Sequence, residues 1–170
     1  MMPWFKRVEK GISTPTEEKK ETPDGLWYKC PECKTVTSMT EHRKNLRTCV
    51  KCNYHDRVGS KEYFAILFDD NKFTEMDEDM SSGDPLDFTD SKPYPQRTAE
   101  TQRKTGLKDA VRTAYGKSGG RDITIACMDF AYIGGSMGSV VGEKIARAID
   151  HARKTRTPFM MISKSGGARM

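Results

Sequence analysis

Four cysteines of the chain are arranged in two closely spaced pairs. Two residues separate Cys30 from Cys33, two separate Cys49 from Cys52, and fifteen lie between the pairs. A spacing of two residues lets a tight turn direct both thiolates at one ion, with backbone amides pointing at the sulfurs, and two such turns complete a tetrahedron. Four cysteine ligands leave no position for water, which argues against a catalytic metal. The pattern therefore predicts one structural zinc ion, without which so small a module would unfold, held by Cys30, Cys33, Cys49 and Cys52.

The alternatives for these four cysteines are disulfide bonds or unligated thiols. The first twelve residues mix Trp4 and Phe5 with three basic residues, and they lack the apolar run of a signal peptide or a membrane span. Without an export signal we expect a reducing cytoplasm. In that compartment paired cysteines bind metal more often than they form disulfides.

Several residues near the cysteines have simpler expected roles. His42 and His55 lie close enough in the sequence to serve as ligands, but a full set of cysteines makes them redundant, so we expect both at the surface. Asn53, after the second pair, tolerates the left-handed backbone often needed there, whereas Lys34, after the first pair, does so less readily. Cys127 lies in an apolar run and is expected to be a small buried core residue.

Two glycine-rich segments form the second candidate for chemistry. A Gly-Gly-Ser-Met-Gly run at 134–138 and a Ser-Gly-Gly-Ala-Arg run at 165–169 each follow a predicted strand, at a turn into a helix. Glycine has no β-carbon, so backbone amides can converge on one oxygen, and a helix N-terminus adds partial positive charge. Such a pair can hold an oxyanion or a phosphate. Alternatively, the glycines only permit sharp turns and close helix packing.

Neither glycine segment carries a familiar nucleotide-binding motif. No Gly-Lys-Ser/Thr of a P-loop follows, and the three-glycine spacing of dinucleotide sites is missing. The sequence also shows no Ser/His/Asp arrangement and no pair of carboxylates placed for acid–base work. Any catalysis in these segments is therefore expected to come from the backbone.

The pattern of apolar residues predicts the elements that carry these segments. Ser60 can cap a helix with one broad apolar face. Two β-capable runs, 109–115 and 122–130, flank a Ser-Gly-Gly-Arg turn and predict a hairpin. A helix over 139–154 then leads to a short buried strand at 158–163. The order strand, helix, strand implies a right-handed crossover and a parallel strand pair.

Charge is distributed unevenly along the chain. The formal net charge is +5, but residues 69–90 hold nine carboxylates and a single lysine, and we interpret them as a surface connection. Residues 29–57 carry a net charge of +4, with Trp27, Tyr28 and Tyr54 in or beside them. Basic residues beside aromatic rings can bind single-stranded nucleic acid. The alternative is that a small domain has a charged surface and packs its aromatics over its own core.

Three parts of the chain together resemble the β subunit of bacterial acetyl-CoA carboxylase carboxyltransferase. They are the four-cysteine module followed by Asp-Ser-Lys at 90–92, the run DFAYIGGSMGSVVG at 129–142, and SGGARM at 165–170. The resemblance spans nearly the whole chain. Tyr-Ile at 132–133 stands where the family commonly has other bulky apolar residues, and Lys34 stands in place of the usual glycine.

This resemblance implies an α/β fold: a small four-cysteine zinc ribbon followed by the opening portion of a crotonase-like (ClpP/crotonase) βαβ spiral. The expected organisation is an N-terminal helix and tether at 1–25, the zinc ribbon at 26–58, connecting helices and an acidic linker at 59–107, and the start of the carboxyltransferase domain at 108–170. The family's core continues past the second glycine turn. We therefore expect the chain to be a truncated product that is inactive alone.

The resemblance also implies a reaction and a set of partners. The family transfers a carboxyl group from carboxybiotin on the biotin carboxyl carrier protein to acetyl-CoA, giving malonyl-CoA for fatty acid biosynthesis in the cytoplasm. An α subunit of related fold, in an α2β2 assembly, and biotin carboxylase are the other expected partners. By this carry-over Gly166 and Gly167 donate to the enolate oxygen, while the substrate pocket is lined by Gly134, Gly135 and Ser136. A different acyl-CoA such as propionyl-CoA is an alternative substrate, and a zinc-ribbon nucleic-acid-binding module is an alternative function.

Overall fold

A computed structural model describes residues 25–169, which divide into two compact units. The first unit ends at His55 and the second begins at Asp56. The expected N-terminal helix and tether at 1–25 lie outside the described residues, except for Gly25. Within residues 25–169, no helix is both long enough and apolar enough to cross a membrane.

The described part of the first unit, residues 25–55, forms a short antiparallel hairpin and one short helix. β1 (Trp27–Lys29) pairs with β2 (Val36–Ser38), and α1 (Met39–Lys44) follows directly. The Ser38 hydroxyl accepts a hydrogen bond from the Glu41 amide at 3.1 Å, which caps the first turn of α1. The helix therefore begins where a polar side chain can satisfy an amide that has no partner within the helix.

The two histidines of the first unit differ in burial. The His42 side chain, on α1, lies flat against the ring of Tyr28 on β1, with ring centroids 3.5 Å apart, and His42 is only 1% exposed. The expectation of a surface position is therefore wrong for His42. A unit this small has few apolar side chains, so a flat imidazole serves as part of its interior. His55 is exposed, as expected, and its Nδ1 lies 3.0 Å from the Thr48 hydroxyl.

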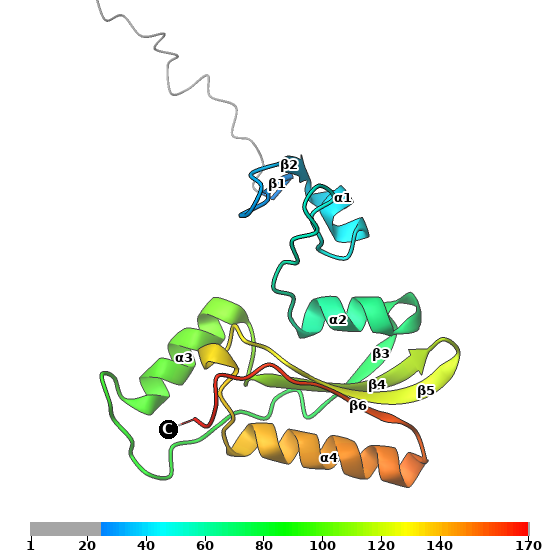
Figure 1. The fold of residues 1–170 in the computed structure, drawn as a ribbon. Helices are drawn as coiled ribbons and strands as arrows, with labels where there is room; N and C mark the ends of the chain where they lie inside the picture. Colours follow the sequence, from blue (N-terminus) through cyan, green and yellow to red (C-terminus); the bar gives the residue numbers. More distant parts are fainter. Residues whose placement is uncertain (1–24, 170) are drawn as a thin grey trace, which may run out of the picture. The chain divides into compact units, whose positions relative to one another are not determined.

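The second unit contains a four-stranded mixed sheet (Figure 1). The β4–β5 hairpin and the parallel β5–β6 pair confirm the predicted strand pairing, and β3 adds an antiparallel edge beside β4. In spatial order the strands are β3 (Phe73–Met76), β4 (Val111–Ser118), β5 (Arg121–Met128) and β6 (Phe159–Ile162). The helices are α2 (Ser60–Leu67), α3 (Tyr94–Thr105) and α4 (Ser139–Thr155).

Helices α2 and α4 lie on opposite faces of this sheet (Figure 1). On β5, Ala126 and Met128 pack in the cluster that includes Val141 of α4, whereas Ile125 and Cys127 pack with the aromatic residues of α2. This alternation follows from the two-residue period of a strand. Cys127 is fully buried, which confirms its expected place in the core, and burial raises the pKa of its thiol to about 12.

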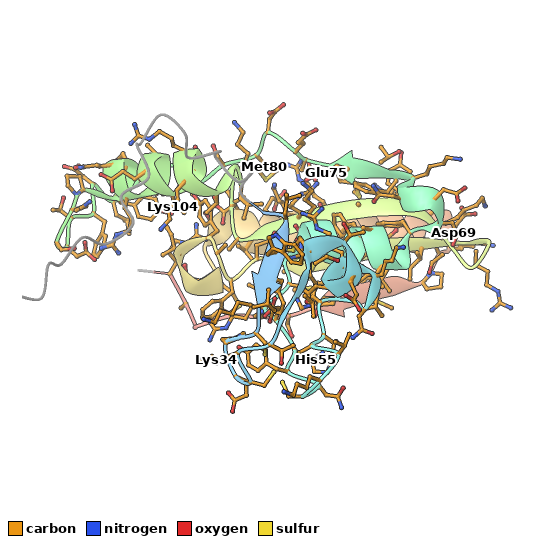
Figure 2. The ribbon with its side chains drawn as sticks, turned by 90° about the horizontal axis from the view of Figure 1, so that it is seen from above. Lys34, His55, Asp69, Glu75, Met80 and Lys104 are labelled. Atoms are coloured by element: carbon orange, nitrogen blue, oxygen red, sulfur yellow. The ribbon has the colours of Figure 1, made fainter. Side chains whose placement is uncertain are left out.

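The acidic segment, expected to be a surface connection, contributes strand β3. The strand brings Phe73 into the core beneath α2, while Glu75 pairs with Arg112 of β4. Earlier in the segment, the Asp69 carboxylate accepts hydrogen bonds from the amides of Gly119 and Gly120, each at 2.8 Å. Figure 2 shows Asp69 at the end of the sheet that carries the β4–β5 turn. Part of the acidic charge therefore has a structural role.

Helix α2 begins one residue earlier than its sequence signal suggests. The N-cap is Gly59, and Ser60 is the first helical residue, with its amide donating to Asp129 Oδ1 at 2.7 Å. The Gly59 amide donates to Glu62 Oε2 at 3.0 Å. A β-carbon at position 59 would lie 2.5 Å from Asp129 Oδ1, so the close approach of this carboxylate requires glycine at the cap.

Candidate metal centre and glycine-loop site

The four cysteines of the first unit come together as predicted. Their sulfur atoms all lie within 4.8 Å of one another, and the Cys30–Cys52 and Cys33–Cys49 sulfur pairs are each 3.6 Å apart. A tetrahedral zinc ion with bonds of about 2.3 Å would place its sulfurs roughly 3.8 Å apart. The cluster therefore has the ligand set and the spacing of a four-cysteine metal site, as in a zinc ribbon.

Backbone amides point at the sulfurs of this cluster. The Cys33 thiol interacts with the hydroxyl and the amide of Thr35, and these contacts lower its pKa to about 6. The Cys52 amide, with that of its neighbour, lowers the pKa of Cys49. At Cys52 the Tyr54 amide also lowers the pKa, but burial and the surrounding thiols outweigh it and raise the pKa to about 12. Four thiolates this close together repel one another, so this arrangement favours a bound cation.

Each cysteine pair is closed by a residue with left-handed backbone. Lys34 has φ 60° and its amide donates to the Cys30 carbonyl at 3.0 Å, while Asn53 has φ 58° and donates to the Cys49 carbonyl at 2.9 Å. The two turns therefore have the same geometry. Asparagine adopts it readily, whereas lysine does so at a cost in conformational energy.

In the second unit, the two glycine segments lie side by side. The Gly166 amide donates to the Gly134 carbonyl at 2.9 Å, and the Met137 amide donates to the Gly167 carbonyl at 2.9 Å. A parallel bridge pairs Met137 with Ala168. The structure thus joins into one site two loops that are 31 residues apart in the sequence, counted from Gly134 to Ser165.

The amides of Gly135, Ser136, Gly166 and Gly167 are hydrogen-bonded within these loops. Besides Gly166, the Gly167 amide donates to the Ser165 hydroxyl at 3.0 Å, and the Gly135 and Ser136 amides donate to the carbonyls of Tyr132 and Ile133. A β-carbon on Gly135 would lie 2.2 Å from the Lys164 carbonyl oxygen. Close packing of the two loops is therefore one physical reason for glycine here, alongside any role toward a ligand.

Arg169 stands in the sequence only as part of the second glycine motif, yet its side chain is central to the site. Its guanidinium pairs with both oxygens of Asp109, at 2.6 and 3.1 Å, and the two side chains are 4% and 0% exposed. Burial alone would raise the pKa of Asp109, but hydrogen bonds from Arg169, Ser82 and the Ala110 amide hold it below its ordinary value. In the sequence, the one sign of this buried ion pair was that Asp109 stands directly before a predicted apolar strand.

A separate cavity of about 840 Å³ lies near the carboxyl end of β5. Glu75 and Lys104, both labelled in Figure 2, are among its lining residues, but no residue of either glycine loop is. Two further lining residues are ionisable and buried: Lys144, whose pKa is lowered by burial, and Asp129, whose Oδ2 has no hydrogen-bond partner among the described residues. Both acidic and basic side chains line this cavity.

Comparison with known proteins identifies the family to which the chain belongs. A family model described as the carboxyl transferase domain matches residues 60–170, and the chain belongs to this family. Among curated relatives, the acetyl-coenzyme A carboxylase carboxyl transferase subunit beta of Pedobacter heparinus is 64% identical over 99% of the chain, and that of Christiangramia forsetii is 62% identical over 99%. The chain spans 60% and 59% of the length of these two relatives.

Solved structures support the same fold. A transcarboxylase 12S structure with methylmalonyl-coenzyme A and methylmalonic acid bound matches with a TM-score of 0.53 and 24% identity, over 76% of this chain and 21% of that chain. A single-chain, multi-domain long-chain acyl-CoA carboxylase matches with a TM-score of 0.54 and 19% identity, over 66% of this chain and 11% of that one. The expected α/β carboxyl transferase fold is confirmed.

Proposed function

We propose that this chain acts in the β subunit of acetyl-CoA carboxylase carboxyltransferase, which moves a carboxyl group from carboxybiotin to acetyl-CoA and forms malonyl-CoA for fatty acid biosynthesis. The observation that carries the proposal is the 64% identity, over 99% of the chain, to a relative of that name. The proposed partners are an α subunit in an α2β2 assembly, the biotin carboxyl carrier protein and biotin carboxylase, in the cytoplasm.

The joined glycine loops suit the chemistry of this reaction. When carboxybiotin loses CO2, the ureido nitrogen that carried it takes a proton from the thioester methyl group, and the resulting enolate carbon bonds to the CO2. The enolate oxygen carries negative charge, which preorganised amide donors stabilise. In the proposal, Gly166 and Gly167 supply these donors, and the surrounding backbone is that of Gly134, Gly135 and Ser136.

A donor role requires the second glycine loop to rearrange when substrate binds. In the structure the Gly166 and Gly167 amides already have acceptors, the Gly134 carbonyl and the Ser165 hydroxyl. Catalytic hydrogen bonds are often poorly aligned in unliganded enzymes and form fully only in the complex. Rotation of the Ser165 side chain alone would release the Gly167 amide, so Gly167 is the more readily available of the two donors.

The proposed metal is one structural zinc ion bound by Cys30, Cys33, Cys49 and Cys52. When bound, the ion supplies cross-linking of the two cysteine turns, and the four thiolates leave no open position for chemistry. The amides that point at the sulfurs stabilise the thiolate form and so favour binding near neutral pH.

The test is carboxyl transfer in the reverse direction, from malonyl-CoA to free biotin, with a β subunit of the relatives' full length and an added α subunit. We expect activity only when both subunits are present. The same assay with methylmalonyl-CoA, the carboxylated form of propionyl-CoA, in place of malonyl-CoA tests the alternative substrate. Absence of transfer from an assembled, zinc-loaded complex would contradict the proposal.

Gly167→Ala tests the donor role within the same assay. Position 167 has φ +130° and open space around it, and so a methyl group there meets no atom but strains the backbone. Gly119→Ala is the matched control, because position 119 also has a positive φ and open space but lies in the β4–β5 turn. For Gly167→Ala we expect kcat to fall by a larger factor than KM rises, and for Gly119→Ala we expect no such change. Full activity of Gly167→Ala would contradict the donor assignment.

One observation favours the nucleic-acid alternative for the first unit. Trp27 is 64% exposed, although Tyr28 packs on His42 as expected for an aromatic that covers the unit's own core. An exposed ring on a basic module can stack on an unpaired base. Titration of the metal-loaded protein with an oligonucleotide in rising salt tests this: a steep fall of affinity with salt supports binding, and no affinity at low salt excludes it.

A further inference from the structure

The Arg169 side chain uses its hydrogen-bonding capacity on four separate segments of the second unit. Beyond its two bonds to Asp109, Nε donates to the Ser136 hydroxyl at 3.0 Å and one terminal nitrogen donates to the Ser136 carbonyl at 2.7 Å. The other terminal nitrogen lies 3.1 Å from the Ser82 hydroxyl and 3.3 Å from the Tyr94 hydroxyl. The guanidinium therefore connects the second glycine loop to the first loop, to Ser82, to α3 and to Asp109 just before β4.

Backbone hydrogen bonds also fix how the two glycine loops align with each other. The Arg169 amide donates to the Met137 carbonyl at 2.8 Å, and the Met137 amide donates back to the Gly167 carbonyl. A β-carbon on Gly138 would lie 3.2 Å from a terminal nitrogen of Arg169, so the guanidinium passes directly beside the N-cap of α4. Main chain and side chain thus hold the two loops at one spacing.

The network needs arginine specifically. A planar guanidinium has five N–H donors in a fixed fork and can pair with both carboxylate oxygens while it donates sideways. Lysine would keep the charge but could not reach Asp109 and both acceptor atoms of Ser136 in that plane. The Tyr132 ring, with its centroid 5.1 Å from the guanidinium carbon, lies over one face of the group.

We propose that Arg169, anchored by Asp109, is a positioning residue that holds the two glycine loops at the spacing required for reaction, without itself contacting substrate. This inference rests on the proposed function where activity is concerned. A displacement of about 1 Å in an active site can lower the rate roughly 100-fold. Loss of the guanidinium should therefore reduce turnover even when the loops remain folded.

The experiment compares Arg169→Lys with wild type in the full-length subunit assembled with its α partner. Arg147→Lys is the control, because Arg147 forms exposed ion pairs with Asp77 and Glu143 away from the loops. Two quantities are measured: hydrogen exchange of peptides covering 132–140 and 164–169, and kcat and KM for transfer from malonyl-CoA to biotin.

We expect Arg169→Lys to speed exchange in both loop peptides while β4 and β5 stay protected, and to lower kcat about 10- to 100-fold with KM changed less than about threefold. The control should change none of these. Added guanidinium should partly restore kcat in Arg169→Ala. Unchanged loop exchange, or unchanged kcat with faster loop exchange, would overturn the inference.

Two further outcomes keep the test decisive. If Arg169→Lys also loses protection in β4 and β5, the experiment is repeated with Ser136→Ala, because this variant removes the contact to Nε and leaves the ion pair intact. Faster exchange in the 164–169 peptide of Ser136→Ala then supports the inference, and unchanged exchange refutes it. If the wild-type complex shows no carboxyl transfer, the proposed function fails, while loop exchange still decides whether Arg169 positions the loops.

Discussion

Individual positions in this protein are constrained by very short distances. The clearest case is Gly135, where an added β-carbon would lie 2.2 Å from the Lys164 carbonyl oxygen and φ is +66°. Both constraints act on the folded state, since an unfolded chain has no such neighbour. Gly142, on α4, is the opposite case, because an added β-carbon there would meet open space.

We predict that Gly135→Ala destabilises the protein by about 2 to 4 kcal/mol, through backbone strain and displacement of the 164 carbonyl. Gly142→Ala should instead stabilise it by about 0.5 to 1 kcal/mol, because alanine is the better helix former. Urea unfolding of both variants measures the difference. Equal stabilities would show that the two loops separate at little cost.

At the cysteine cluster we predict that Cys33→Ser lowers the bound zinc from one ion per chain to well below one, since three thiolates no longer complete the tetrahedron. Cys127→Ser is the control, because Cys127 is buried in the other unit and its substitution leaves the four ligands in place. Metal analysis of the purified proteins gives the stoichiometry. Full zinc content in Cys33→Ser would argue against the assigned ligand set.

At the scale of elements, the Asp109–Arg169 pair connects the start of β4 to the second glycine loop and gives the protein a defined acid sensitivity. The pKa of Asp109 is lowered in the folded protein, so its carboxylate stabilises the fold above the unfolded-state pKa of about 3.9 and loses this effect as the pH falls through the lower folded-state value.

We therefore predict that Asp109→Asn costs about 3 to 5 kcal/mol of stability near pH 7, because it leaves a buried guanidinium without its counter-charge. The difference from wild type should stay constant between pH 5 and 8, within roughly 0.5 kcal/mol, and shrink only below about pH 4. Chemical unfolding over this pH range measures it. A difference that changes between pH 5 and 8 would assign the effect to another group.

The elements could be predicted where the pattern was local. The β4–β5 hairpin follows from alternating apolar residues around a glycine turn, and α4 from one apolar face. Strand β3 was hidden because it is only four residues long, with Phe73 and Met76 as its apolar residues, and it lies within a strongly acidic segment. The partner of Arg169 lies 60 residues away, and no local pattern reports a contact over that separation. Likewise, the burial of His42 depends on the ring of Tyr28 across the first unit.

At the scale of the whole molecule, the chain divides into a unit with a four-cysteine cluster and a unit with its own apolar core. Between residues 25 and 55, the first unit has little interior beyond the cysteine cluster and the Tyr28–His42 stack, whereas the second unit has two hydrophobic clusters on the faces of one sheet. Their stabilities should therefore respond differently to loss of metal.

We predict that a chelator unfolds the first unit and leaves the sheet of the second intact. Hydrogen exchange should become fast over residues 26–54 and stay slow over β4 and β5, since the ion contributes folding free energy only where it is bound. Re-addition of zinc should restore protection. Loss of protection in β4 and β5 on chelation would mean that the two units fold as one.

The separation between Asp109 and Arg169 has a consequence for synthesis on the ribosome. The carboxylate is made 60 residues before its partner, and translation of that interval takes on the order of 3 to 12 s. Until Arg169 emerges, a nascent chain that closed the sheet around Asp109 would bury an uncompensated charge. The β4–β5 hairpin can form early from local contacts, whereas the two glycine loops can settle together only at the end of this interval. A pause in translation before codon 169 would therefore hold the nascent protein with its hairpin formed and its loops still open.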